Sequence, residues 1–384
     1  MIRKICIVVT ARPSYSRVKS LLEHLKNSEK VELQLVVAAS ALLERYGRVL
    51  DDMISDGFIP DRKIYMSLEG ENLLTSAKST GLGIIELSSV FNELKPDIVV
   101  TVADRFETIS TAIAAAYNNI PLAHIQGGEV TGSIDEKVRH AVTKLSDIHF
   151  VSNTDSYERV IRMGEDKDTV FETGCPSIDL VKDVLVNYST NNSKDIFNQG
   201  VGDKIDLSSN YLVAMQHPVT NEYLDSFEQI QQTLEAISEL NIPTIWFWPN
   251  MDAGSDKISK ALRLFREKNS KNMIYFLKNL PPEDFLPLLN NSCCLVGNSS
   301  VGIRESSFMG VPVVNIGSRQ TGRLRGKNVI DVDPNKEAII AAVNKQLKRG
   351  YFDKEFTYGD GNSGEKICKI LETIDTKIDK KITY

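Results

Sequence analysis

The residues best suited to bind an anion lie where a predicted strand passes into a predicted helix in the last third of the chain. The apolar run Cys294–Val296 predicts a buried strand, and Gly310 ends the helix that follows it. Asn298, Ser299 and Ser300 open that helix. The first amides of a helix have no partners within it, and the helix dipole favours negative charge there. The turn therefore suits a phosphate group, although the serines could equally serve only as helix caps.

Two arginines return to the same edge of the predicted sheet. Val311–Ile316 predicts the next parallel strand, and Arg319 and Arg323 follow it. Because the carboxyl ends of parallel strands meet at one edge, we expect both guanidinium groups to lie near Ser299 and Ser300. Their positive charge favours the phosphate interpretation, so the sequence predicts a site for a diphosphate.

Two strands of the first half of the chain also end in charged residues. Ile98–Val102 is followed by Asp104, and Ile5–Val9 is followed by Arg12. A carboxylate at the carboxyl edge of a sheet suits catalysis, and an arginine there suits a phosphate. Asp104 could also cap the next helix, and Arg12 could be a surface residue, so both interpretations stay open.

The densest group of polar candidates lies in the stretch HIQGGEVTGSIDEKVRH, His124–His140. Its glycines let the backbone pass close to a ligand. Ser133 and Glu136 have the spacing of a capping box, with Asp135 in the first helical turn. Arg139 lies one turn further on and could pair with Asp135. Two carboxylates, a Gly-Gly turn and two histidines so close together favour a functional site over a structural cap.

His217 directly follows the predicted strand Tyr211–Met215. A histidine titrates near neutral pH, which suits proton transfer. A single buried histidine can also be structural, and both interpretations stay open. If the two halves of the chain form a cleft, His217 could face Asp104 and Asp135 across it.

Length and composition describe an ordinary globular protein. The 384 residues suffice for two domains, and 42% hydrophobic and 25% charged residues are typical of soluble proteins. The net charge of −6 argues against a broad nucleic-acid-binding surface. No apolar run approaches the ~20 residues that span a bilayer, so we expect no membrane partner. Five cysteines without metal-ligand spacing, and no signal peptide, favour a cytoplasmic location.

Strands and helices alternate along the chain, which predicts an α/β fold with doubly wound sheets. Further strands of the first series are predicted at Leu33–Ala38, Pro121–Ile125, His149–Val151 and Val170–Phe171. Further strands of the second series are predicted at Thr244–Trp248 and Met273–Phe276. We expect a first domain at residues 1–186, a polar linker at 187–210 and a second domain at 211–364. A closing helix, within residues 365–384, is expected to pack back on the first domain.

Two nucleotide motifs are missing. The turn after the first strand reads TARPSYSR and lacks the glycine fingerprint of dinucleotide-binding proteins, so a nicotinamide cofactor is not expected. The segment GDGNSGEK, residues 359–366, resembles a phosphate-binding loop but has Glu365 where the lysine should be. We predict neither a cofactor nor a metal.

A family resemblance emerges when the motifs are taken in order: DRFE, HIQGGEVTGSIDEKVRHAVTKL, GCPS, QHPVT, PNMDAGS, GNSSVGIRE and GSRQTGR. Together they make the chain resemble the hydrolysing UDP-N-acetylglucosamine 2-epimerases of sialic-acid synthesis, over about Ile5 to Leu371. The resemblance implies a glycosyltransferase-B-like fold, with two Rossmann-like domains and the nucleotide sugar between them. It also implies the reaction of UDP-N-acetylglucosamine with water to give N-acetylmannosamine and UDP, through a 2-acetamidoglucal. No NAD and no obligatory metal are implied.

The resemblance further implies a role for each candidate residue. Ser299, Ser300, Arg319 and His217 would stabilise the leaving diphosphate, with Arg12 on the phosphate side. Glu305 would hold the ribose, and Leu280 and Phe285 would pack on uracil. The catalytic candidates are Asp104, Arg105, Gln126, Asp135 and His217. The remaining substrate-binding candidates are Arg17, Glu129, Arg139, Asn250 and Arg323.

Gln126 departs from the family pattern, because many relatives have an acid at this position. An amide cannot accept a proton, so the role of base falls to Asp104 or Asp135. Relatives also often carry an acid where Pro13 and Ser14 stand. A GDP- or UDP-linked diacetamido sugar, as in legionaminic-acid synthesis, is therefore an alternative substrate.

Two further alternatives remain, a glycosyltransferase of the same fold and an inactive nucleotide-sugar sensor. A homodimer or homotetramer is expected, with helices of the first domain as its interface.

Overall fold

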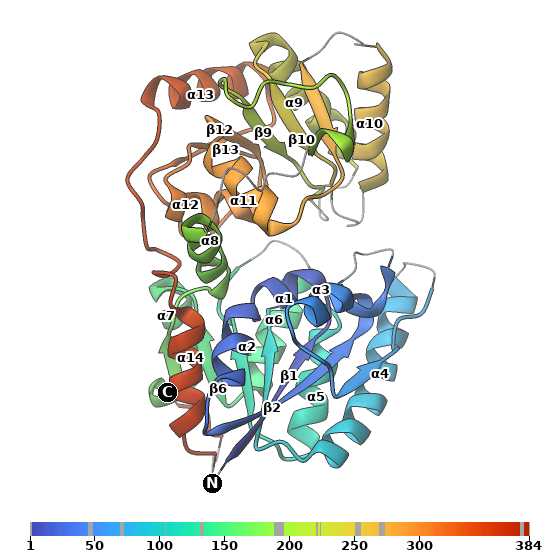
Figure 1. Cartoon of the computed structure of the whole chain (residues 1–384), viewed down its shortest axis with the longest axis vertical. Coiled ribbons are helices and arrows are strands. Elements are labelled where there is room, and N and C mark those ends of the chain that lie inside the picture. Colours follow the sequence, from blue (N-terminus) through green and yellow to red (C-terminus); the bar gives the residue numbers. More distant parts are fainter. Residues whose placement is uncertain are drawn as a thin grey trace. The chain divides into compact units, whose positions relative to one another are not determined.

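The structure is a computed structural model that describes residues 2–44, 49–69, 73–103, 105–130, 134–187, 196–219, 222, 224–249, 255–268, 273–376 and 380–383. The chain divides into two compact units (Figure 1). Unit 1 comprises Met1–Glu129, Ile134–Leu180 and Tyr358–Tyr384, and unit 2 comprises Val130–Ser133 and Val181–Thr357. No helix of the described residues is both long and apolar enough to cross a membrane.

The described residues of unit 1 form a seven-stranded parallel sheet in the order β3-β2-β1-β4-β5-β6-β7. The strands are β1 (Arg3–Val9), β2 (Val31–Ala38), β3 (Arg62–Ile64), β4 (Ile98–Val102), β5 (Leu122–Ile125), β6 (Ile148–Val151) and β7 (Val170–Glu172). The strand order reverses between β1 and β4, which is where ligands bind in open sheets of this kind.

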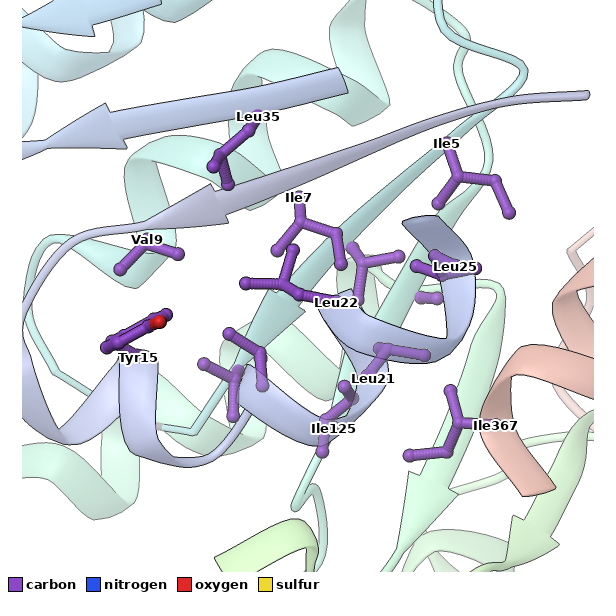
Figure 2. Packing of buried hydrophobic residues seen from close by; sticks show 14 of the residues in the cluster. Ile5, Ile7, Val9, Tyr15, Leu21, Leu22, Leu25, Leu35, Ile125 and Ile367 are labelled. Atoms are coloured by element: carbon purple, nitrogen blue, oxygen red, sulfur yellow. The ribbon is translucent and has the colours of Figure 1, made fainter. Parts of the chain in front are cut away.

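Helices cover both faces of this sheet. They are α1 (Arg12–Ser16), α2 (Lys19–Lys26), α3 (Val49–Ser55), α4 (Leu73–Leu94), α5 (Thr108–Tyr117), α6 (Ile134–Leu145), α7 (Thr154–Arg162) and α14 (Ser363–Thr373). Ile5, Ile7 and Val9 pack into one hydrophobic cluster with α2 and α14 (Figure 2). Cys6 and Val8 pack into a second cluster with α4 and α5. Successive residues of β1 are therefore buried on opposite faces, as its continuous apolar sequence predicts.

The described residues of unit 2 form a second seven-stranded sheet, in the order β14-β13-β12-β9-β10-β11-β8. The strands are β8 (Gly200–Val201), β9 (Leu212–Met215), β10 (Thr244–Phe247), β11 (Ile274–Leu277), β12 (Cys294–Gly297), β13 (Val313–Ile316) and β14 (Val329–Val332). All pairs are parallel except β11 with the edge strand β8. The order reverses between β9 and β12, which marks the ligand edge of this unit.

The helices of unit 2 are α9 (Ser226–Leu240), α10 (Ser255–Lys268), α11 (Pro282–Asn290), α12 (Glu305–Met309) and α13 (Lys336–Arg349). One core cluster joins β9, β10, β11, β12 and β13 to α9, α10 and α13. An additional helix, α8 (Pro176–Asn187), contains the boundary between the two units. Both units are doubly wound α/β structures, so the predicted fold class is confirmed.

The C-terminal helix α14 belongs to unit 1 and is anchored there by Asp179. The Asp179 carboxylate accepts hydrogen bonds from the backbone amides of Ser363 (2.9 Å) and Gly364 (2.7 Å) and from the Ser20 hydroxyl (2.8 Å). A carboxylate at this end satisfies the first amides of the helix and complements its dipole. Asp179 therefore caps α14 from a distant part of the chain.

The structure differs from the predicted elements in three respects. Strands β3, β8 and β14 were not predicted, and β8 lies within the expected linker at 187–210, where it pairs with β11. The helix expected to open with Asn298, Ser299 and Ser300 is instead a 3₁₀ turn, Ser300–Gly302, followed by the short helix α12. Gly310 ends α12 with a positive φ of 73°, as predicted. The expected domain borders at 186, 210 and 364 stay predictions.

Candidate active site

The strands β9 and β12 approach each other very closely at the switch point of unit 2. Gly297 has a φ of 138°, and a Cβ atom placed on it would lie 2.0 Å from the Met215 carbonyl oxygen. Only glycine fits this position, because any side chain would collide with backbone and its φ would be strained. The residues that follow the two strands are consequently brought side by side.

Asn298 joins these two strand ends. Its side-chain oxygen Oδ1 accepts a hydrogen bond from the backbone amide of His217 (2.7 Å), and its Nδ2 donates to the His217 carbonyl (2.9 Å). The Asn298 backbone amide donates to the Met215 carbonyl (3.0 Å). The asparagine side chain thus continues the pairing of β9 and β12 beyond their last residues.

The imidazole of His217 is held in its neutral form. The residue is only 4% exposed, and burial lowers its pKa to about 3, with the positive charge of Arg319 acting in the same direction. The expectation that His217 titrates near neutral pH is therefore wrong. A neutral imidazole can still donate a hydrogen bond to an oxygen atom of a ligand.

Ser299 and Ser300 form the turn that follows Asn298. The Ser299 hydroxyl accepts from the Val301 amide (3.4 Å), and the Ser300 hydroxyl accepts from the Arg304 guanidinium (3.1 Å). Ser299 therefore caps the 3₁₀ turn, as the structural interpretation predicted. A capping hydroxyl can still contact a ligand, so the predicted phosphate role of the turn stays open.

Arg319, one of the two predicted arginines, reaches this turn. Its Nη1 donates to the Asn298 carbonyl (3.2 Å), and Gln320 Nε2 donates to the same oxygen (2.8 Å). Arg323 Nε instead donates to the carbonyl of Val130 (2.9 Å), which belongs to unit 2. Loops from β9, β12 and β13 therefore meet at Asn298.

Three further candidates of unit 2 lie in this unit's loops and helices. Glu305 begins α12, and its buried Oε2 has no hydrogen-bond partner among the described residues. Leu280 is buried before α11, and the Phe285 ring packs edge-on against Phe247 at 5.3 Å between centroids. A buried carboxylate oxygen suits a hydroxyl donor of a ligand, and the apolar pair suits a flat ring.

The ligand edge of unit 1 includes residues in a strained conformation. Ala103 after β4 and Gln126 after β5 have φ angles of 64° and 66°, which non-glycine residues rarely adopt. Gln126 is buried, and its Nε2 donates to the Cys175 thiol (2.7 Å), which also contacts the Ser177 hydroxyl (2.9 Å). Such strain concentrates at functional sites, where packing holds it in place.

His124 connects β5 to the residue that follows β4 at this edge. It is fully buried, with Nε2 2.8 Å from the Ala103 carbonyl and Nδ1 3.2 Å from the Thr143 hydroxyl. Burial lowers its pKa to about 3, so the neutral ring cross-links β5 to the end of β4. His140 pairs with Glu136 (2.9 Å). The two histidines thus have protein partners in this structure, and the functional site expected in this stretch stays a prediction.

The loop after β5 is braced by buried polar contacts. Glu129 accepts from the Ser152 hydroxyl (2.8 Å), and its carbonyl accepts from Arg139 Nη1 (2.9 Å). Arg139 is buried and forms an ion pair with Glu136 (3.7 Å), the neighbour of the expected partner Asp135. Asp135 lies in the first turn of α6, as expected.

The remaining candidates of unit 1 lie around α1 and β4. Arg12 is the first residue of α1 and Arg17 is its C-cap. Arg105, next to Asp104, donates from Nε to the buried Glu107 (3.2 Å). Asp104, Asn250 and Ser133 lie outside the described residues.

Comparison with known proteins identifies the family. A family model described as UDP-N-acetylglucosamine 2-epimerase matches residues 23–372. The chain belongs to this family. The predicted family resemblance is thereby confirmed.

Several relatives of this epimerase family match nearly the whole chain. The UDP-N,N'-diacetylbacillosamine 2-epimerase (hydrolyzing) of Legionella pneumophila is 35% identical over 375 residues, which cover 97% of each chain. The GDP/UDP-N,N'-diacetylbacillosamine 2-epimerase (hydrolyzing) of Campylobacter jejuni is 32% identical and covers 90% of this chain and 89% of its own. The UDP-N-acetylglucosamine 2-epimerase of Neisseria meningitidis is 30% identical, with coverages of 98% and 96%.

Solved structures of the epimerase family share the fold. The Neisseria meningitidis UDP-GlcNAc 2-epimerase bound to UDP-GlcNAc superposes with a TM-score of 0.79 at 19% identity and covers 96% of this chain and 99% of its own. The Methanocaldococcus jannaschii enzyme in complex with UDP-GlcNAc and UDP gives 0.77 at 21% identity, with the same coverages. The predicted glycosyltransferase-B-like fold is confirmed.

Two buried residues of this chain that contact the candidate site, Asn298 and Gln320, were not predicted as site residues. Asn298 was interpreted only as part of a helix start, and Gln320 was not singled out. The signal for Asn298 was present, because an asparagine directly after a strand-ending glycine can pair with the neighbouring strand end. No local signal identifies Gln320, since its contact with Asn298 depends on tertiary structure.

Proposed function

We propose that this protein is a hydrolysing 2-epimerase of a UDP-linked 2-acetamido sugar. The observation that carries the proposal is the convergence of neutral His217, Arg319 and the Ser299–Ser300 turn at the switch point of unit 2. Hydrogen-bond donors and a fixed positive charge are what a leaving diphosphate requires. The names of the Legionella and Campylobacter relatives, which include the word hydrolyzing, support the same chemistry.

In the proposed reaction a base removes the proton at C2 of the sugar while UDP leaves C1. Water then adds to the resulting 2-acetamidoglucal with inversion at C2, which gives the free epimerised sugar and UDP. Neutral His217 would donate a hydrogen bond to the diphosphate, and Arg319 would stabilise its charge. Glu305 would accept from the ribose hydroxyls, with Leu280 and Phe285 beside uracil.

The base is assigned to Asp104 or Asp135. Gln126 cannot act as the base, because an amide does not accept a proton at neutral pH and its Nε2 already donates to Cys175. Arg105 and Glu129 would line the sugar, while Arg12 and Arg17 would lie on the phosphate side. The Cys175 thiol, which accepts a hydrogen bond from Gln126, would keep the Gln126 amide oriented. Asp104 or Asp135 would carry out the proton transfer.

We place a UDP-linked diacetamido sugar first among the substrates. This reverses the order expected from the sequence, in which UDP-N-acetylglucosamine came first. The relatives with 35% and 32% identity carry diacetylbacillosamine in their names, whereas the Neisseria relative, with 30%, carries N-acetylglucosamine. UDP-N-acetylglucosamine is kept as the second candidate on the strength of that third relative.

The deciding experiment is an NMR time course in deuterated water with each UDP-sugar supplied separately. We expect release of free UDP and of the 2-epimer with deuterium at C2, with a higher kcat/KM for the diacetamido substrate. A higher kcat/KM for UDP-N-acetylglucosamine would reverse the order of the two substrates. Epimerised sugar that is still attached to UDP would contradict the hydrolysing course, and transfer only to an added acceptor would indicate a glycosyltransferase.

We also propose that the protein forms a homodimer or homotetramer through helices of unit 1. Large apolar side chains on α4 and α5 support this, since Ile85 and Tyr117 are 63% and 87% exposed. Exposed apolar groups on neighbouring helices are typical of protein interfaces. Light scattering of the purified protein measures its mass, and a monomer would contradict the proposal.

A further inference from the structure

One residue connects, through its side chain and its backbone carbonyl, the three loops that contribute to the predicted diphosphate site. His217 follows β9, Ser299 follows β12, and Arg319 follows β13. The Asn298 side chain forms hydrogen bonds with the backbone of His217, and Asn298 directly precedes Ser299. The Asn298 backbone carbonyl accepts a hydrogen bond from the Arg319 side chain. It is 2% exposed, so these contacts are shielded from water.

The two hydrogen bonds to His217 can be made together only by an amide. The His217 backbone amide donates to Asn298 Oδ1 (2.7 Å), and the His217 carbonyl accepts from Asn298 Nδ2 (2.9 Å). Exchanging the two atoms would set donor against donor and acceptor against acceptor, so the orientation of the amide is defined. A carboxylate would place an oxygen against the His217 carbonyl, and a serine has only one polar atom.

The carbonyl of Asn298 serves the third loop. It accepts from Arg319 at 3.2 Å and from Gln320 at 2.8 Å, which uses both of its lone pairs. Gly297 next to it lies so close to β9 that a Cβ atom on it would be 2.0 Å from the Met215 carbonyl oxygen, and the Asn298 amide donates a hydrogen bond to that same oxygen (3.0 Å). The separation between His217, the serine turn and Arg319 is therefore set by contacts that converge on one residue.

We propose that Asn298 is a positioning residue, which holds the His217 loop and the Arg319 loop at the spacing that a diphosphate requires without itself contacting the substrate. The inference rests on the proposed function, since it assigns the diphosphate to these loops. A preorganised set of donors binds an anion more tightly than the same donors on loosely held loops, because no ordering is required on binding.

The test compares two variants of Asn298 with a matched control. Asn298→Ala removes both hydrogen bonds to His217, and Asn298→Asp keeps the shape but replaces the donor by a charged acceptor. Asn328→Ala is the control. Asn328 is also 2% exposed, and its Nδ2 donates to the Val311 carbonyl (2.8 Å). Asn328 precedes β14, so it lies at the amino edge of the unit 2 sheet, whereas Asn298 follows β12 at the carboxyl edge.

The readout is the affinity for UDP relative to that for uridine, measured by calorimetry on the full chain. For Asn298→Ala we expect UDP affinity to fall about tenfold while uridine affinity stays within about twofold. For Asn298→Asp we expect a UDP loss of about a hundredfold, because the carboxylate also repels the diphosphate. Asn328→Ala should lose thermal stability and leave the UDP-to-uridine affinity ratio unchanged.

Each other outcome counts against a specific statement. Unchanged UDP affinity in either folded Asn298 variant, or an equal loss for UDP and uridine, would overturn the positioning role. Failure of both Asn298 variants to fold where Asn328→Ala folds would assign Asn298 to sheet stability and also overturn it. Wild-type protein that binds neither UDP nor uridine would instead overturn the proposed function.

Discussion

Burial decides what individual histidines of this chain can do. His124 and His217 both have a pKa lowered to about 3, because each ring is removed from water and burial disfavours the charged form. His149 is buried too, and its pKa is lowered for the same reason although Glu165 opposes the shift. These three residues are neutral at physiological pH, so any of them in the reaction would act as a hydrogen-bonding group and not as a cation.

The neutral histidines make stability depend on pH below about 6.5. In the unfolded chain a histidine gains a proton near pH 6.5, whereas folded His124 does so only near pH 3, so the unfolded state binds more protons in between. The free energy of unfolding is thus highest above this window and falls as the pH is lowered through it. Between about pH 7.5 and pH 5 we expect His124 and His217 each to lower the free energy of unfolding by about 2 kcal/mol.

Substitution tests this pH dependence directly. His124→Gln should be less stable than the wild type at about pH 7.5 but should lose about 2 kcal/mol less on going to about pH 5, as measured by urea denaturation. His24→Gln serves as the control, because His24 is exposed on α2. An identical pH dependence in the His124 variant and the wild type would contradict the burial argument.

Asp135→Asn tests the assignment of the base. We expect kcat to fall by about a hundredfold or more, since removal of a general base has effects of this size, with little change in UDP affinity. Asp155, exposed in the first turn of α7, provides the matched control Asp155→Asn, which should leave kcat unchanged. If Asp135→Asn retains the wild-type rate, Asp104 is the remaining candidate.

Arg319→Ala tests the diphosphate site by inhibition. The loss of a charge-assisted contact should raise the inhibition constant of UDP by about tenfold to a hundredfold, with a smaller effect on uridine. Arg349→Ala removes the same charge from the end of α13, where the guanidinium lies 4.9 Å from the Phe352 ring. An unchanged inhibition constant in Arg319→Ala would remove this residue from the site.

At the scale of elements, the sequence predicts central strands well and edge strands poorly. Ile98–Val102 is buried at every position and was predicted with its observed bounds. β3 and β14 escaped prediction because each lies at a sheet edge and is at most partly buried, so its sequence lacks a continuous apolar run. Their identity as strands comes from pairing with β2 and β13, which is a long-range effect.

The interrupted helix after β12 has a tertiary origin as well. A Cβ atom on Gly302 would lie 3.0 Å from the side chains of Leu295 and Val313, so this turn packs tightly onto β12 and β13. Local propensity does not contain that contact, which explains why a continuous helix was expected. For the same reason the role of Gln320 could not be predicted, since its contact with Asn298 depends on where the β13 loop lies.

Two glycine substitutions test the docking of α14. A Cβ atom on Gly364 would lie 2.3 Å from the Ser20 hydroxyl and 2.7 Å from the Leu21 amide, so Gly364→Ala should destabilise the fold by about 1–3 kcal/mol. In contrast, a Cβ atom on Gly81 within α4 would meet nothing within 4 Å, so Gly81→Ala should stabilise by about 0.5–1 kcal/mol. Thermal unfolding compares both, and equal stability would contradict close packing of α14 on α2.

At the scale of the whole molecule, the proposed diphosphate site predicts which of the two units is protected when UDP binds. UDP at about a hundred times its dissociation constant should stabilise the folded protein by about 2.7 kcal/mol if it binds only the folded state. Hydrogen exchange should show protection in the loops after β9, β12 and β13 of unit 2, where the proposed diphosphate contacts lie. Protection confined to unit 1 would contradict the proposed site.

The return of α14 to unit 1 has a consequence for the order of events during synthesis. Unit 1 begins the chain, yet its last part is Tyr358–Tyr384, whereas all described strands of unit 2 end by Val332. In a growing chain every described strand of unit 2 therefore leaves the ribosome before α14 does, and domains fold as units as they emerge. Until then Leu21 and Leu25 of α2 lack Ile367, with which they share one core cluster (Figure 2). Unit 1 is thus completed only after unit 2 has been made, and α2 stays without its α14 contacts until then.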